Sequence, residues 1–224
     1  MWDASLAYSQ FDADLRLGGQ DTALSERMLA VSLGRRLGER WHASVTAAAI
    51  LGGDLIAPGA SPEVGAGFLG ALDGSVRLLD EQRLSPSVQV TLGVAAARTH
   101  TQPSPTTERA GLTALDARVG ITIGKTLFDR VGVHVAARGF AGPVSWDRQP
   151  AVSGGDRHHY QLGAGVSVAL PQQLRVFAEW SPFGERAVTA GIGLAFGAKP
   201  TPPPPAPAEP SNQIIAWGQT VGQQ

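Results

Sequence analysis

Residues 115–139 read LDARVGITIGKTLFDRVGVHVAARG, and apolar side chains alternate with polar or small ones in two successive runs. Successive side chains of a β-strand point to opposite faces of its sheet. The two runs therefore predict an antiparallel hairpin, with one apolar face and one face of polar or small residues. The apolar set consists of Leu115, Ala117, Val119, Ile121, Ile123, Val131, Val133, Val135 and Ala137.

The same alternation recurs along nearly the whole chain and predicts an all-β protein of about ten strands without intervening helices. Longer connections are expected after the first, third, fifth and seventh strands, and short ones after the second, fourth, sixth, eighth and ninth. Long loops at one end and tight turns at the other are typical of an antiparallel up-and-down transmembrane β-barrel. Eight strands are the alternative, if the first and ninth do not belong. The predicted strands are residues 6–17, 27–35, 41–51, 66–78, 88–97, 115–124, 131–146, 160–170, 175–181 and 187–196.

The apolar positions change phase within the first predicted strand. Leu6 and Tyr8 occupy even positions, whereas the apolar residues from Phe11 to Leu17 occupy odd ones. An inserted residue changes the phase of a strand, so we expect a β-bulge near Ser9 and Gln10.

Composition favours a barrel whose apolar face meets lipid. Only 17% of the residues are charged, whereas a soluble surface carries roughly 25–35%. A soluble lipocalin-like barrel with its apolar face inward remains the alternative. The net charge of -1 gives no reason to expect binding of nucleic acid. The absence of Cys excludes disulfides and thiolate metal sites, and no apolar run approaches the ~18 residues of a membrane helix.

Aromatic residues at strand ends predict an interfacial girdle, formed by Trp41, Tyr160, Trp180 and Phe196. Over about residues 5–196 the pattern resembles small bacterial outer-membrane β-barrel proteins, broadly the outer membrane protein A class. The last predicted strand, 188–196 (VTAGIGLAF), resembles the aromatic-terminated signal that the barrel-assembly machinery of this class reads. The resemblance implies a bacterial outer-membrane location, contact with membrane lipid and assembly by that machinery.

The chain divides into a barrel (1–197), a linker (198–210) and a short tail (211–224). The linker contains seven of the sixteen prolines and is expected to be an extended spacer. An even number of strands places both termini at the end that carries the tight turns. The resemblance assigns this end to the periplasm. In the tail, apolar residues could dock on a periplasmic partner, and a disordered end is the alternative. These residues are Ile214, Ile215, Trp217 and Val221.

Charged residues on the expected inner face predict a lumenal network of ion pairs. An acid/base site is the alternative, but no nucleophile, base and orienting partner can be aligned, so we expect no enzyme and no cofactor. His158 and His159, beside Asp156, suggest a polar loop edge, with a surface metal site as the alternative. The predicted network contains Asp73, Arg77, Asp116, Arg118, His134, Arg138, Arg175 and Glu179.

The function predicted from the sequence is that of a structural or interaction protein, whose periplasmic tail engages a partner. A narrow passive pore is the first alternative, because the inner residues between the charges are small. Long side chains such as those of Arg77, Arg118 and Arg138 are expected to obstruct it. A soluble carrier of an apolar ligand is the second alternative.

Overall fold

One antiparallel sheet contains thirteen strands in the computed structural model, which describes residues 1–59, 61–102 and 109–197. No helix in these ranges is long and apolar enough to cross a membrane. The only helical turn described in them is η1 (Pro171–Gln173). The strands are β1 (Trp2–Leu17), β2 (Gln20–Leu37), β3 (Trp41–Ile56), β4 (Glu63–Val64), β5 (Gly67–Leu79), β6 (Ser87–Gln102), β7 (Ala110–Leu127), β8 (Val131–Ala141), β9 (Pro143–Trp146), β10 (Val152–Asp156), β11 (Tyr160–Ala169), β12 (Leu174–Gly184) and β13 (Arg186–Phe196).

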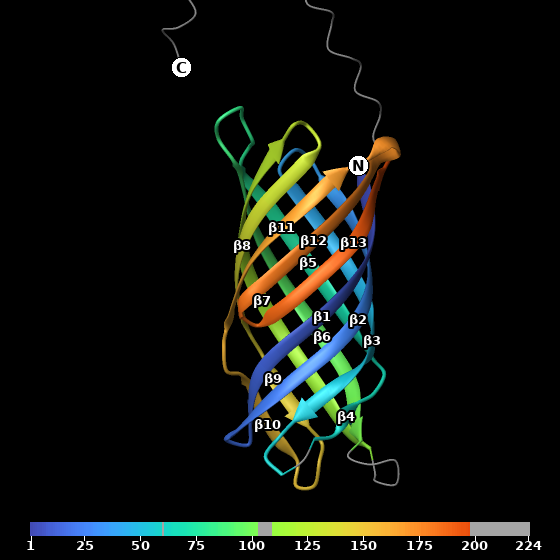
Figure 1. Ribbon diagram of the computed structural model, residues 1–224, viewed down its shortest axis with the longest axis vertical. Helices are drawn as coiled ribbons and strands as arrows, with labels where there is room; N and C mark the ends of the chain where they lie inside the picture. Colours follow the sequence, from blue (N-terminus) through green and yellow to red (C-terminus); the bar gives the residue numbers. More distant parts are fainter. Residues whose placement is uncertain (60, 103–108, 198–224) are drawn as a thin grey trace, which may run out of the picture.

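Ten of these strands close into a barrel, which confirms the predicted transmembrane-type fold (Figure 1). The ring runs β1, β2, β3, β5, β6, β7, β8, β11, β12, β13 and back to β1. Closure rests on the β1–β13 ladder, which extends from Trp2 opposite Phe196 to Asp12 opposite Arg186. A closed ring satisfies the backbone hydrogen bonds of every strand, which lipid requires.

A second, smaller ring continues the barrel at one end. There β3 pairs with β4, β4 with β6, β7 with β9, β9 with β10, and β10 with β1. We call this end, which carries β4, β9 and β10, the long-loop end (Figure 1). The opposite end, near the N-terminus, is the short-turn end, and the β2–β3 turn (38–40) and β7–β8 turn (128–130) lie there.

Three predicted boundaries are wrong. The connection after the first strand is a tight turn at Gly18 and Gly19, which both have positive φ, so β2 begins at Gln20. The strand predicted over residues 131–146 is divided, because β8 pairs with β7 and β11 whereas β9 leaves β8 to pair with β7 and β10. The loop predicted over 147–157 contains β10, which becomes a strand by pairing with β1 and β9.

The bulge predicted near Ser9 and Gln10 is also wrong, because the β1–β2 register is continuous from Trp2 to Leu17. Leu6 and Tyr8 point outward and are 42% and 44% exposed. The odd residues point inward throughout, and from Ala13 to Leu17 they are buried in the smaller ring. The strand thus keeps the same inward and outward positions along its length. The apolar residues lie on its outward face in the first half and on its inward face in the second half.

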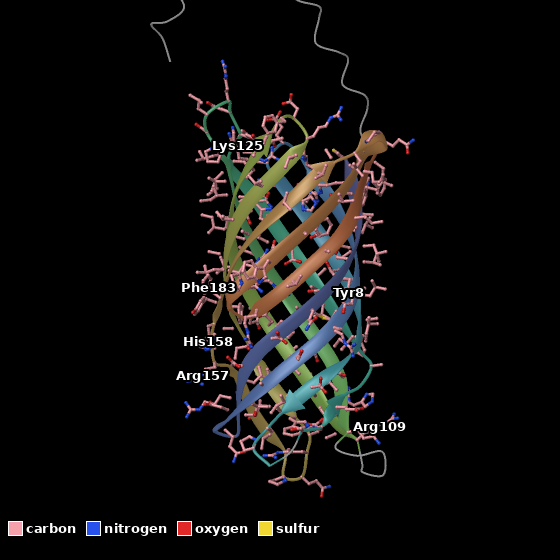
Figure 2. The ribbon with its side chains drawn as sticks, viewed as in Figure 1. Tyr8, Arg109, Lys125, Arg157, His158 and Phe183 are labelled. Carbon is pink, nitrogen blue, oxygen red and sulfur yellow. The ribbon has the colours of Figure 1, made fainter. Side chains whose placement is uncertain are left out.

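An apolar band covers the outside of the ten-strand ring. Val31, Leu72 and Leu92 are 56%, 59% and 62% exposed although they lie in the middle of long strands. Such a continuous apolar surface suits lipid and is the reverse of what a soluble carrier needs. Figure 2 shows Tyr8 and Phe183 about midway along the barrel, with Lys125 at the short-turn end and Arg109, Arg157 and His158 in the long-loop half.

Candidate functional site: the lumen

Three neighbouring strands, β8, β11 and β12, carry a polar cluster inside the ten-strand ring. Glu179 on β12 is its centre, and its Oε2 lies 3.0 Å from His134 Nε2 on β8. Arg138 lies four residues further along β8, on the same inner face, and its Nη2 donates to the same oxygen at 3.0 Å. Its Nη1 donates to Gln161 Oε1 of β11 at 2.7 Å. The cluster links the inner faces of three adjacent strands, β8, β11 and β12.

The other residues of the predicted network lie apart from this cluster. Arg118 Nε and Asp116 Oδ2 form an ion pair at 3.3 Å on β7. Arg77 pairs with Asp80 at 3.3 Å near the short-turn end. The guanidinium carbon of Arg175 lies 5.7 Å from the ring centre of Phe177. Asp73 lies on the inner face of β5, close to the backbone of Gly93. The charges are therefore distributed in separate groups along the lumen.

Gly165 makes room for this polar cluster. A Cβ built at this position would lie 2.3 Å from Cε1 of His134 and 2.8 Å from the carbonyl oxygen of Ala178. Gly165→Ala should therefore push the imidazole away from Glu179 and destabilise the barrel by about 1–3 kcal/mol, the usual cost of overpacking. Urea unfolding of the refolded protein in liposomes measures this change.

Gly70→Ala is the matched control, because a Cβ at Gly70 meets no atom within 4 Å. Its free energy of unfolding should change by less than about 0.5 kcal/mol. Equal effects of the two substitutions would mean that strand flexibility, and not the contact with His134, explains the loss.

The smaller ring is filled by an apolar core. Leu17, Leu55, Leu112 and Trp146 are between 0% and 4% exposed. They pack in one cluster with Ala13, Leu15, Leu24, Ala57, Val64 and Val144. Trp146 Nε1 also donates to Thr101 Oγ1 at 2.8 Å, which satisfies both buried polar groups. Rings of this size are just wide enough for side chains to fill them. Among the described residues, this core fills the smaller ring at the long-loop end of the lumen.

Two of the spaces inside the barrel are lined by charged side chains. A vestibule of about 830 Å³ lies at the short-turn end and is lined by Arg36, Arg40, His42 and Arg175, among others. An inner cavity of about 280 Å³ lies between the polar cluster and the apolar core. We call the second space the inner cavity.

Carboxylates gather at the inner cavity. Glu26, Asp116, Asp156, Glu179 and Glu185 line it. Glu185 lies in the turn between β12 and β13, where burial and the neighbouring Asp156 raise its pKa to about 8. Burial raises the pKa of Asp156, at the end of β10, to about 6, and Asp116 adds to the shift. At pH 7 Glu185 is therefore mostly protonated, whereas Asp156 is mostly ionised.

Sequence reasoning did not find Glu26, Asp156 and Glu185 as inner residues. Glu26 fell just outside the strand predicted over 27–35, although it has the same parity as the inner residues of β2. Asp156 and Glu185 were placed in loops. For Glu26 the alternation, extended by a few residues, could have signalled an inner position. For the other two, only strand pairing and the burial of a turn reveal it.

The predicted girdle residues all lie outside the barrel: Trp41, Tyr160, Trp180 and Phe196 are 60%, 46%, 62% and 40% exposed. His158 Nε2 lies 3.6 Å from Asp14 Oδ2. No group of His, Cys, Asp and Glu in the described ranges is arranged to hold a metal ion. Residues 198–224, with Ile214, Ile215, Trp217 and Val221, lie outside the described residues.

The fold and the outward apolar band define a transmembrane β-barrel. The solved translocator domain of the autotransporter NalP from Neisseria meningitidis is similar, with a TM-score of 0.51 and 11% identity, over 87% of this chain and 88% of that one. The transport unit of AIDA-I from Escherichia coli gives a TM-score of 0.46 and 11% identity, over 87% and 90% of the two chains. The beta domain of the Bordetella autotransporter BrkA gives 0.47 and 18%, over 87% and 98%.

No protein-family model and no curated protein matches the sequence. The likeness to NalP shows a shared barrel fold and supports the resemblance to bacterial outer-membrane β-barrels. Membership of the outer membrane protein A class stays a prediction.

Proposed function

We propose that this protein is a bacterial outer-membrane barrel that acts as a structural or interaction protein and does not conduct. The observation that carries this proposal is the apolar core of the smaller ring, where Leu55 is 0% exposed. An open pore needs a continuous polar path, and buried leucine and tryptophan side chains interrupt it. The vestibule is then a blind space that opens at the short-turn end.

The orientation that we propose places the short-turn end in the periplasm. Trp2 and Phe196 pair there, so the last described strand ends beside the first residues of the chain. Small outer-membrane barrels have short periplasmic turns and longer extracellular loops. The extension 198–224 then begins on the periplasmic side, where it would engage a protein partner.

Planar-bilayer recordings test the closed lumen. Protein refolded in detergent, with a boiling-dependent shift in gel mobility as proof of a closed barrel, should give no steady current above that of the bare bilayer. The apolar core is the reason, since it leaves no room for hydrated ions. Reproducible conductance steps from the heat-modifiable species would contradict the proposal and favour the narrow passive pore.

The interaction role has a separate test. Cross-linking in cells that produce the full chain, or a chain that ends at Gly197, should yield a periplasmic adduct only with the full chain. The truncated barrel should still show heat-modifiable mobility, so a lost adduct cannot be attributed to misfolding. Identical adducts from both chains would remove residues 198–224 from the interaction.

A further inference from the structure

The inner cavity combines an apolar wall with acidic side chains. Its apolar lining includes Phe11, Leu15, Leu24, Met28, Leu112 and Val144. Its volume of about 280 Å³ lies near the lower limit of small-molecule pockets, which run from roughly 300 to 1,000 Å³. A compound with one ring or a short alkyl chain is the size that the space accepts.

Carboxyl groups outnumber guanidinium groups at the inner cavity. Arg138 is matched by Glu179 and Arg118 by Asp116. Glu26, Asp156 and Glu185 then remain. Asp156 interacts electrostatically with the nearby His158 and His159, and Glu185 with Arg118, but Glu26 has no charged or hydrogen-bonding partner among the described residues. The cavity therefore has an excess of carboxyl groups.

Glu26 gives the second, independent indication of a ligand. Glu26 is only 6% exposed and lines the cavity. It lies on β2, directly opposite Phe11 of β1. A buried carboxyl group without a partner costs free energy, and a cationic group brought to it would offset that cost. The facing ring of Phe11 can also attract a cation through its π face.

A metal ion does not fit this arrangement, because the carboxylates in the described ranges do not converge into a set of ligands. We propose that the inner cavity binds a small organic ammonium compound with an apolar body. The ammonium group donates hydrogen bonds to the carboxylate of Glu26 and to those of Glu185 and Asp156. The apolar body lies against Phe11, Leu15 and Leu112.

Binding should strengthen as the pH rises. The pKa of Asp156 is raised to about 6 and that of Glu185 to about 8, so both are protonated in acid and ionised in alkali. Only the ionised carboxylates attract a cation, and bound cation in turn displaces their protons. The charged groups that face these two side chains are Glu26 on β2, Asp116 and Arg118 on β7, Arg138 on β8, His158 and His159 before β11, and Glu179 on β12.

The test uses 2-phenylethylammonium as the probe and the refolded full chain in a non-ionic detergent. Calorimetric titration at pH 8.5 should show saturable binding that weakens at pH 5.5. Glu26→Gln and Glu185→Gln should each lower the affinity about tenfold or more, because each removes a charge-assisted hydrogen bond. Glu39→Gln, which changes an exposed carboxylate in the β2–β3 turn, should leave the affinity unchanged.

Two further probes, one neutral and one negatively charged, test whether binding requires the positive charge. 2-Phenylethanol and 3-phenylpropanoate share the ring but lack the positive charge, and both should bind at least about tenfold more weakly than the ammonium. The proposal is overturned if the ammonium does not bind, if both Gln variants bind like the wild type, or if the alcohol binds as tightly. These outcomes do not depend on conductance or on the tail, so they leave the proposed function to its own tests.

Discussion

Leu55→Ala should remove about 2–5 kcal/mol from the stability of the long-loop half. Leu55 is 0% exposed at the centre of the apolar core, between β4 and the neighbouring strands, so its loss leaves a cavity. The ten-strand ring should survive, because Leu55 lies beyond the β3–β5 ladder, which ends at Ile50 of β3. We therefore expect faster amide exchange in β4, β9 and the end of β3, with unchanged protection in β11 to β13.

Leu84→Ala is the control for this experiment, since Leu84 is 93% exposed in the connection between β5 and β6. Its effect should stay within about 0.5 kcal/mol. If amide exchange in the Leu55→Ala protein matched that of the wild type throughout the long-loop half, the core would not be what holds the smaller ring. The smaller ring would then no longer account for a closed lumen.

Glu179→Gln should destabilise the barrel by about 2–3 kcal/mol. The substitution keeps the shape of the side chain but leaves Arg138 and His134 without their shared carboxylate. Breaking a fully buried pair costs about 3–5 kcal/mol, and the Arg138 and Glu179 side chains are 33% and 20% exposed, so a smaller loss is expected. Urea unfolding in liposomes, followed by tryptophan fluorescence, measures the difference.

Two variants show whether the charge pair causes this loss. Asp21→Asn breaks a surface ion pair between Asp21 and Arg157, whose side chains are 64% and 56% exposed respectively. The substitution should lower the free energy of unfolding by less than about 1 kcal/mol. Replacing both Arg138 and Glu179 by Met should recover part of the stability, because no unpaired charge then remains. A Glu179→Gln protein that unfolds at the wild-type urea concentration would show that lumenal water already solvates Arg138.

The fold was predictable because its signal is local. Val119 and Ile121 alternate with Arg118 and Gly120, and this spacing alone gives both the strand and its two faces. Which charged side chains of the lumen contact one another was less predictable. His134 and Glu179 are both inner residues by parity, but the sequence does not say that they lie on either side of Gly165 of β11. Arg175 shares the parity of Glu179 on β12 and does not join the cluster.

The long-loop end was missed for a related reason. β4 has only two residues and β10 has five, two of them glycine, so no alternation marks them. They exist as strands because β3, β6, β9 and β1 present unpaired backbone edges to them. The same partners place Asp156 at the inner cavity, which no loop prediction could do.

The sequence by itself determined a closed antiparallel barrel, its approximate strand count and the outward direction of its apolar face, because side-chain alternation depends only on the strand backbone. Tertiary structure alone decided where the environment of β1 changes from lipid outside to apolar core inside, and which carboxyl groups of the lumen are left unpaired. Both depend on register and on the shorter β12–β13 hairpin, which bring residues far apart in the chain, such as Glu26 and Glu185, to one cavity.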